Sequence, residues 1–287
     1  MQVGPMQVGP MQVGVFAKTF AGTDPHEVLS ACRQAGFDCV QYNTACSGLG
    51  PLPENIPETS AVQLAAAARA TGIGIAALSA TYNMTDPDPD RRLAGRAAFA
   101  ALADFAMAID CPMLTVCSGS LDAEDKWRHH PQNDAPESWT EMCREFEILC
   151  AIAEARNILI GVEPEPANIV SSSARAADLL ASFAGSPVRI ILDPANLIEG
   201  IPPHRHQFAI DEAFDRLGPM IALAHAKDRF ADGTVAPAGR GVVDWLHVLR
   251  GLATCGFNGP IIAHGMTADE AGGVAVYLAT LLRQVAS

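Results

Sequence analysis

The sequence has few basic residues. Its 19 Lys and Arg residues are outnumbered by 32 Asp and Glu residues, which gives a formal net charge of −13 at pH 7. A surface with this excess of carboxylates repels phosphate backbones and anionic membrane surfaces. Neither nucleic acid nor a membrane is therefore an expected partner.

The chain also lacks the segments that mark a membrane protein or a disulfide-rich one. No stretch reaches the roughly 18 apolar residues that a transmembrane helix requires. The eight cysteines are scattered and form no CxxC pair. We expect them to be small buried residues in a reducing compartment rather than disulfide partners or zinc ligands. The expectation is a soluble, cytoplasmic protein.

A glycine-rich phosphate loop is missing as well. The first apolar run, VGVFAKTFAGTDP, contains no GxGxxG, which disfavours a dinucleotide-binding open sheet. The sequence does contain ample material for a core, since 49% of its 287 residues are hydrophobic and 18% are charged. One large domain is the economical interpretation, because α/β barrels commonly have roughly 250 residues.

The N-terminus is a repeat. MQVGP occurs at residues 1–5 and again at 6–10, and MQVG follows at 11–14. Identical copies of this kind are typical of a slipped coding repeat or a misplaced start rather than of folded structure. We expect residues 1–10 to be an extension without function and residues 11–287 to form the domain.

From Val13 onward, short apolar runs alternate with longer segments of helical character, which is typical of βα units and a parallel sheet. Eight strands are predicted, and they begin near Val13, Asp38, Gly74, Pro112, Leu159, Val188, Ile221 and Pro260. The clearest helices are predicted over 25–36, 60–71, 91–109 and 136–156. Eight strands with eight helices favour a closed (β/α)8 TIM barrel of the α/β class.

Four of the later strands end at ionisable side chains. LIGVEPEPANI ends in Glu163 and Glu165, IILDPANLI in Asp193 and Asn196, IALAHAKD in His225, Lys227 and Asp228, and PIIAHGM in His264. The carboxyl ends of barrel strands meet at one mouth, so we expect these groups to converge. Carboxylates and imidazoles suit one divalent ion with positions open for substrate oxygens. Mn²⁺ is the first candidate cofactor, with Mg²⁺, Co²⁺ and Zn²⁺ as alternatives.

The order of these motifs resembles the sugar phosphate isomerase/epimerase superfamily, also called the xylose-isomerase-like TIM barrels. The resembling segments within 159–266 are VEPEPANIV, LDPANL, HAKD, AGRG followed by VDW, and GPIIAHGM. The upstream stretch SGSLDAEDKWRHHPQN, followed by Trp139, is similar to a fourth-strand loop of these proteins. The motifs are specific for the superfamily and not for one substrate.

The resemblance implies a metal ion held by Glu163, Asp193, His225 and a residue of the eighth strand. In epimerase members that last ligand is usually a glutamate, which also serves as one of two acid/base groups. The aligned residue here is His264, so Glu163 and His264 are the candidate catalytic residues. Imidazole binds a metal only when neutral, so we expect metal affinity to fall as the pH drops through about 6.5. A carboxylate at this position is expected to hold the ion to lower pH.

Each of these residues has a structural alternative. Glu163 can pair with a Lys or Arg at the barrel end, Asp193 before a proline can cap a helix, and His225 can be a core histidine. Glu165 is the weaker of the two glutamates, because the prolines on either side of it indicate that the chain has left the sheet.

Further residues are candidates for substrate binding, namely Asn196, Lys227, Arg240, Trp127 and His129. Trp127 and His129, in KWRHHPQN, offer a stacking face and a donor suited to a sugar. Arg240 lies between two glycines, where a turn can aim its guanidinium at a polyol or an anion. The alternatives are that Lys227 pairs with Asp228, that Asn196 stabilises its own loop, and that the others are solvated.

The predicted function is that of a divalent-metal-dependent isomerase or epimerase of a sugar or keto-sugar. Chelation of an α-hydroxy carbonyl compound stabilises the enediolate that forms when a base removes the neighbouring proton. No Lys/Arg-rich phosphate clamp is evident, which favours an unphosphorylated sugar or polyol as the partner. The sequence leaves open whether the chain forms a homo-oligomer.

Three alternatives use the same fold. A metal-dependent lyase or dehydratase acting on a keto-sugar or keto-inositol needs one base and one acid, which suits the replacement of glutamate by His264. A non-catalytic sugar-binding barrel would have a decayed metal site. An endonuclease acting on damaged DNA would need three metal ions and a basic face, which the net charge of −13 opposes.

Overall fold

The strands of this protein form a closed barrel in a computed structural model that describes residues 11–286. Neighbouring barrel strands are parallel, in the order β6-β5-β4-β3-β2-β1-β9-β7, and the pairing of β6 with β7 closes the ring. These strands are β1 (Gln12–Phe16), β2 (Cys39–Tyr42), β3 (Gly74–Ser79), β4 (Met113–Val116), β5 (Leu159–Val162), β6 (Val188–Leu192), β7 (Ile221–Arg229) and β9 (Pro260–Ala263). The predicted TIM barrel is confirmed. The repeated residues 1–10 lie outside the described residues.

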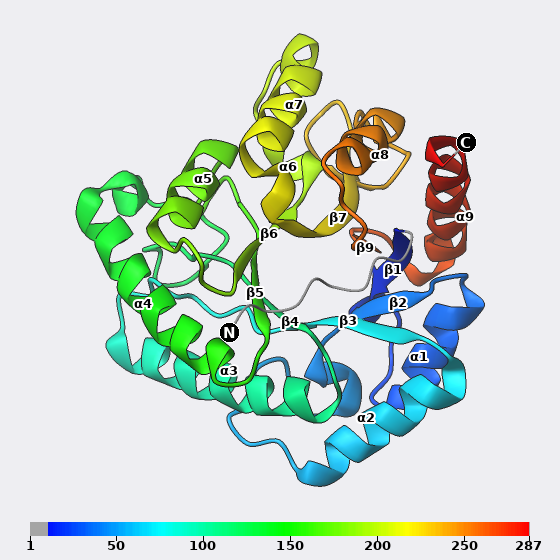
Figure 1. The fold of residues 1–287 in the computed structure, drawn as a ribbon, viewed down its shortest axis with the longest axis horizontal. Helices are drawn as coiled ribbons and strands as arrows, with labels where there is room; N and C mark the ends of the chain where they lie inside the picture. Colours follow the sequence, from blue (N-terminus) through cyan, green and yellow to red (C-terminus); the bar gives the residue numbers. More distant parts are fainter. Residues whose placement is uncertain (1–10, 287) are drawn as a thin grey trace.

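Helices surround this ring of strands (Figure 1). They are α1 (Pro25–Gln34), α2 (Glu58–Thr71), α3 (Pro89–Ala108), α4 (Pro136–Glu154), α5 (Ser173–Ser182), α6 (Pro194–Leu197), α7 (His206–Leu217), α8 (Trp245–Thr254) and α9 (Ala268–Val285). The side chains of Asp24 and Asp88 cap α1 and α3, each followed by a proline in the first turn. Gly72, with a φ of 68°, is the C-cap of α2. Within residues 11–286, no helix combines the length and apolar character needed to cross a membrane.

One strand of the structure is not predicted from the sequence. β8 (Val235–Pro237) pairs antiparallel with the outer end of β7, opposite Lys227 to Arg229. β7 has nine residues, whereas the other barrel strands have four to six. The two strands therefore form a hairpin that extends β7 beyond the barrel rim.

Apolar side chains fill two layers. The larger layer lies between the strands and the helices and includes the buried side chains of Trp245, Phe99 and Phe146. The smaller layer fills the barrel and consists of Cys39, Ala77, Met113, Leu159, Ile191, Ala222, Leu223 and Ile262. Six of the eight cysteines are buried and none forms a disulfide, as predicted. Burial raises the pKa of the Cys111 thiol to about 12.

A polar layer follows the apolar layer inside the barrel. Within or directly after six strands, a polar residue stands two positions after a member of the inner layer: Gln41, Ser79, Thr115, Asp193, His225 and His264. Strand side chains alternate between the two faces, so a residue two positions on points to the same face. The barrel is thus closed by apolar side chains near its N-terminal end and lined by polar side chains at its C-terminal mouth.

Candidate functional site

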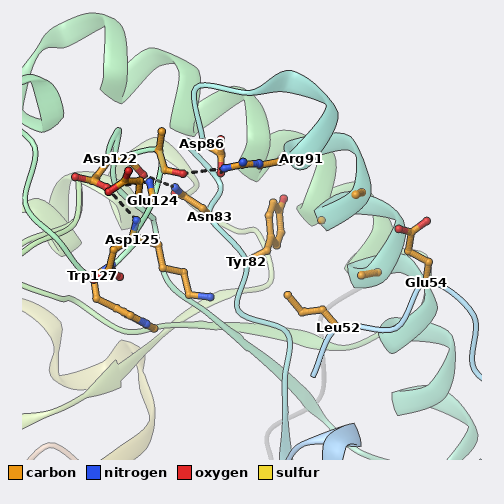
Figure 2. A pocket seen from close by; sticks show the side chains of 15 residues that line it. Leu52, Glu54, Tyr82, Asn83, Asp86, Arg91, Asp122, Glu124, Asp125 and Trp127 are labelled. Carbon is orange, nitrogen blue, oxygen red and sulfur yellow. Dashed lines mark hydrogen bonds and ion pairs between the residues drawn. The ribbon is translucent and has the colours of Figure 1, made fainter. Parts of the chain in front are cut away.

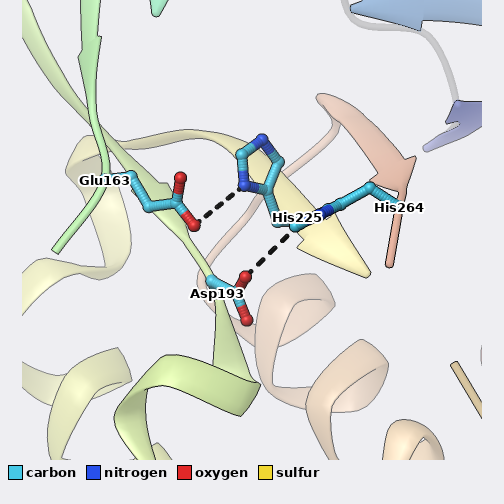
Figure 3. Close-up of side chains that lie close together, drawn as sticks. All are labelled: Glu163, Asp193, His225 and His264. Carbon is cyan, nitrogen blue, oxygen red and sulfur yellow. Dashed lines mark ion pairs between the residues drawn. The ribbon is translucent and has the colours of Figure 1, made fainter. Parts of the chain in front are cut away.

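Glu163, Asp193, His225 and His264 come together at the C-terminal mouth (Figure 3). Three of them directly follow β5, β6 and β9, and the fourth lies within β7. One ligand atom from each side chain lies within 4.8 Å of the others. Two ligand atoms on opposite sides of an ion, each about 2.2 Å from it, lie about 4.4 Å apart. The cluster therefore has the size of a site for a single ion.

Nδ1 of His225 and Nε2 of His264 are buried and make no hydrogen bond, whereas Oδ2 of Asp193, also buried, has Lys227 as an ion-pair partner. Nδ1 of His225 lies 3.0 Å from Oε1 of Glu163, and Nε2 of His264 lies 3.5 Å from Oδ2 of Asp193. Buried polar atoms without a partner are costly, and a proton or a cation between such facing atoms removes the cost. Two carboxylates and two imidazoles fit a divalent transition-metal ion.

The orientation of His225 depends on Gln41, a residue that was not predicted. Nε2 of Gln41 donates hydrogen bonds to Oγ of Ser79 (3.1 Å) and Oγ1 of Thr115 (3.2 Å). Oε1 of Gln41 therefore faces Nε2 of His225, at 2.9 Å, and accepts its hydrogen. Nδ1 of His225 is left with a lone pair that points into the cluster. The available signal was a single polar residue in a buried strand, CVQY.

Replacing Gln41 by Leu is expected to weaken Mn²⁺ binding about tenfold, because the second partner of a metal-ligating histidine fixes its tautomer and ring orientation. Calorimetric titration of both proteins with Mn²⁺ measures the change. Gln41→Glu keeps the acceptor and should bind Mn²⁺ at least as tightly as the wild type. Equal affinities of the wild type and Gln41→Leu would show that Gln41 does not position His225.

Asp193 uses its two carboxylate oxygens differently. Oδ1 accepts hydrogen bonds from the backbone amides of Ala195 and Asn196 at the start of α6. Oδ2 faces the cluster and lies 3.0 Å from Nζ of the buried Lys227. Burial tends to raise the pKa of Asp193, but Lys227 and His264 outweigh it and hold this pKa well below its usual range. Asp193 is therefore a helix cap and a charged member of the cluster at once.

The alternative pairing of Lys227 with Asp228 is wrong. Adjacent side chains of a strand point to opposite faces, so Lys227 reaches Asp193 while Asp228 points away from the barrel interior. Asp228 is fully buried and accepts hydrogen bonds from the backbone N–H groups of Arg229, Gly239 and Val243 and from the indole of Trp245. A Cβ on Gly241 would lie 2.3 Å from Oδ1 of Asp228. Asp228 thus holds the AGRG and VDW segments against β7.

Replacing Asp228 by Ala is expected to lower the free energy of unfolding by about 3 kcal/mol, because several buried donors lose their acceptor. Asp244→Ala is the matched control, since Asp244 is a surface cap that accepts from the backbone of His247, and its loss should cost about 1 kcal/mol. Urea unfolding of both variants measures the difference. Equal losses would show that the burial of Asp228 makes no additional contribution to the free energy of unfolding.

Two carboxyl groups at the mouth have raised pKa values. Burial raises the pKa of Glu163 to about 7, against the opposing charge of Lys227. Burial, and next the charge of Glu163, raises the pKa of Glu165 to about 8. Asn196 donates to Oε1 of Glu163 at 3.0 Å and so holds this carboxyl in place. Groups with such pKa values can both take and return a proton near neutral pH.

The pKa values of the two imidazoles shift in the opposite direction. Burial lowers the pKa of His225 to about 4, and burial also holds the pKa of His264 below its ordinary value. Both side chains are therefore neutral at physiological pH. A neutral imidazole is the form that binds a metal ion.

The cluster opens on a cavity of about 540 Å³, whose lining includes Glu163, Glu165, His225, His264 and Trp127. This volume lies within the range of about 300–1,000 Å³ that is usual for small-ligand sites. Of the predicted substrate-binding residues, Trp127 lines the cavity. Asn196 and Lys227 are not part of its lining; Asn196 contacts Glu163, and Lys227 contacts Asp193.

The other two predicted substrate-binding residues lie elsewhere. Arg240 lines a separate cavity with Glu270 and Tyr277 of α9. His129 is exposed and is not part of the lining of the cavity at the cluster. The guanidinium that lines this cavity belongs to Arg229, whose Nε donates to the carbonyl of Ala195 at 3.0 Å. Arg229 is the last residue of the long strand β7, one position beyond the run IALAHAKD that the sequence argument considered.

The fold and this cluster together define a class of protein, the TIM barrels with a carboxylate–imidazole site at the C-terminal mouth. The chain belongs to the xylose isomerase-like TIM barrel family, whose model matches residues 29–281. The predicted resemblance is confirmed. No curated protein is similar enough in sequence to match the chain.

Solved structures with the same fold include sugar epimerases. 3-keto-D-glucoside 4-epimerase from E. coli has a TM-score of 0.73 at 16% identity, and the match covers 94% of this chain and 99% of that one. D-psicose 3-epimerase from Clostridium cellulolyticum, bound to D-tagatose, has a TM-score of 0.72 at 16% identity, with 95% and 99% covered. A xylose isomerase-like barrel from Mycobacterium smegmatis, in complex with magnesium, has a TM-score of 0.69 at 15% identity, with 97% and 98% covered. These likenesses show a shared fold.

Proposed function

We propose that this protein is a divalent-metal-dependent isomerase or epimerase of an unphosphorylated sugar or keto-sugar. The observation that carries the proposal is the cluster of four ligand side chains, with two buried imidazole nitrogens that make no hydrogen bond, which opens on a cavity that also holds Glu165. The names of two structural neighbours, both keto-sugar epimerases, support the same substrate class.

Glu163, Asp193, His225 and His264 would hold the ion. Their mixed oxygen and nitrogen donors favour Mn²⁺ over Mg²⁺, because imidazole is a poorer ligand for Mg²⁺. Magnesium in the barrel from Mycobacterium smegmatis makes that ion the first alternative. When bound, a divalent ion supplies a Lewis acid that polarises a substrate carbonyl and lowers the pKa of the adjacent C–H group.

The residues of the chain supply the proton transfers. Glu163 is the first candidate for the base that removes the proton from carbon, since its carboxylate lines the cavity at the cluster, where a substrate would lie. Glu165 lines the same cavity, and burial raises its pKa, so it is the candidate for the group that delivers a proton there. Return of the proton to the neighbouring carbon gives isomerisation, and its return to the opposite face of the same carbon gives epimerisation.

A lyase or dehydratase is the second candidate function. The observation that favours it is the unequal set of groups at the mouth: Glu163 and Glu165 are carboxyl groups, and His264 is an imidazole at the position where the resemblance implies a second carboxylate. Elimination of a β-oxygen group needs one base and one acid, whereas epimerisation by two opposed carboxylates is symmetrical. The products of the reaction separate the two functions.

The test is incubation of the Mn²⁺-loaded protein in D₂O with a panel of ketoses and keto-glycosides, followed by NMR and mass spectrometry. An isomerase or epimerase gives an isomer of unchanged composition with deuterium at the reacting carbon. A lyase gives a product that has lost water or an aglycone. Removal of the metal with a chelator should abolish either reaction. If the protein binds Mn²⁺ and neither exchanges deuterium nor forms a product with any substrate, the chain is a binding protein and the proposal fails.

A further inference from the structure

A second cavity adjoins the one at the metal-ligand cluster. It has a volume of about 480 Å³ and lies between α3 and the segment that follows β4. Leu52, Lys126 and Trp127 line both cavities, so the two spaces share one wall. Figure 2 shows Trp127 and Leu52 at one side of the second cavity and Asp86 and Arg91 at the other.

The segment that carries Trp127 is held in place by its own hydrogen bonds. Arg128 binds Asp122 with two short hydrogen bonds, of 2.6 and 2.7 Å. The carbonyl of Lys126 accepts from Asn168 at 2.7 Å, and its ammonium donates to the carbonyl of Thr81 at 3.2 Å. Trp127 itself remains 47% exposed. An aromatic ring fixed at the shared wall with half of its surface open is a preformed platform for a ligand.

The charge of the second cavity indicates which ligands it accepts. Its lining carries five carboxylates and two cations, Arg91 and Lys126, and the neighbouring Arg128 pairs with two of the carboxylates, Asp122 and Glu124, so negative charge remains in excess. Arg91 is already engaged, since it donates to the carbonyl of Ala123 and lies 3.6 Å from Asp86. A phosphate or carboxylate would meet repulsion there, whereas carboxylates readily accept hydrogen bonds from hydroxyl groups. The cavity suits an uncharged, hydroxylated group.

We propose that the substrate extends from the cluster into this second cavity, and that it is a glycoside in which the reacting sugar is joined to a second uncharged, hydroxylated unit. The inference rests on the proposed function for the reacting sugar. Trp127 lies between the two positions, where its ring would contact both units. Free monosaccharides would occupy only the cavity at the cluster.

The experiment fills the second cavity and leaves the cluster unchanged. Ala94 of α3 lines this cavity and is exposed, so Ala94→Phe places a ring in it. Ala108→Phe, an exposed position at the other end of the same helix, is the matched control. The affinities of the Mn²⁺-loaded proteins for D-glucose, cellobiose, maltose, trehalose and sucrose are measured by calorimetry.

We expect at least one disaccharide to bind the wild type more than about tenfold more tightly than D-glucose, because a second sugar unit adds many ligand atoms to the contact. Ala94→Phe should remove this advantage and leave the affinity for D-glucose unchanged, and Ala108→Phe should keep it. The inference is overturned if no disaccharide binds more tightly than D-glucose, or if Ala94→Phe binds them as the wild type does. Binding requires no turnover, so this result is independent of whether the protein isomerises any sugar.

Discussion

The Asp193→Asn variant is expected to bind Mn²⁺ more than about 100-fold less tightly than the wild type, and to lose activity with it. Even a residue that only supports a metal ligand contributes about 10–100-fold in affinity, and Asp193 supplies the most strongly ionised carboxylate of the cluster. Asparagine has the same shape and keeps an oxygen for the backbone amides at the start of α6. The helix cap therefore survives while the charge is lost.

The control for the Asp193→Asn variant has to take Lys227 into account. Its buried ammonium lies 3.0 Å from Asp193, and removing one partner of a buried ion pair leaves an uncompensated charge. The double variant Asp193→Asn/Lys227→Met removes that charge and should recover thermal stability without recovering Mn²⁺ binding. Asp24→Asn, which changes the surface cap of α1, should bind Mn²⁺ as the wild type does. Mn²⁺ affinity and the melting temperature of the metal-free proteins are the measurements. Micromolar binding by the double variant would remove Asp193 from the ligand set.

The barrel could be predicted from the sequence because its pattern is repetitive. Each strand is a short apolar run such as LIGV or PIIA, and helices such as α1 and α4 begin at a proline after a capping or extended residue. β8 could not be predicted, because Val235–Pro237 is only three residues long and contains a proline. Its pairing with β7 depends on contacts that the fold supplies.

Some residues of the site could likewise be predicted from the sequence, and others could not. Glu163, Asp193, His225 and His264 each interrupt an apolar run at a strand end, so their convergence followed from the topology of a barrel alone. Gln41 does the same in β2, but an amide without charge gave no reason to expect a metal site. Its role depends on the register of β2, β3 and β4, which brings it to Ser79 and Thr115.

Arg240 shows the limit of argument from a local motif. Two flanking glycines made its guanidinium look mobile enough to reach a substrate. Gly241 is instead required because the backbone passes against Asp228 and Arg229, where a Cβ would lie within 2.1 Å of a carbonyl oxygen. The turn that this packing produces directs Arg240 toward α9, and Arg229 lines the cavity in its place.

Burial also reverses one expectation about pH. In water the pKa of a carboxyl group is lower than that of an imidazole. A carboxylate therefore stays unprotonated, and able to bind a metal ion, to lower pH than an imidazole does. In this cluster burial raises the pKa of Glu163 to about 7 and holds that of His264 below its ordinary value. Glu163 therefore takes up a proton at higher pH than the imidazole does, whereas Asp193 stays charged. Of Glu163 and His264, His264 is thus the ligand that better tolerates acid.

The His264→Glu variant is accordingly expected to lose Mn²⁺ at higher pH than the wild type. Below about pH 7 the wild type takes up one proton, on Glu163, in competition with the ion. The variant takes up two, because the new carboxyl is buried beside the charged carboxylate of Asp193, and burial and this charge both raise its pKa. Each additional proton lowers the apparent affinity about tenfold per pH unit, so by pH 5 the variant should have lost about 100-fold more affinity than the wild type. At pH 8 its additional negative charge should make it bind Mn²⁺ at least as tightly.

Calorimetric titrations of both proteins from pH 5 to pH 8, with circular dichroism to confirm that they stay folded, measure the two slopes. Parallel slopes would show that residue 264 does not ligate the metal, and a shallower slope for the variant would show that burial does not govern the pKa values of this cluster.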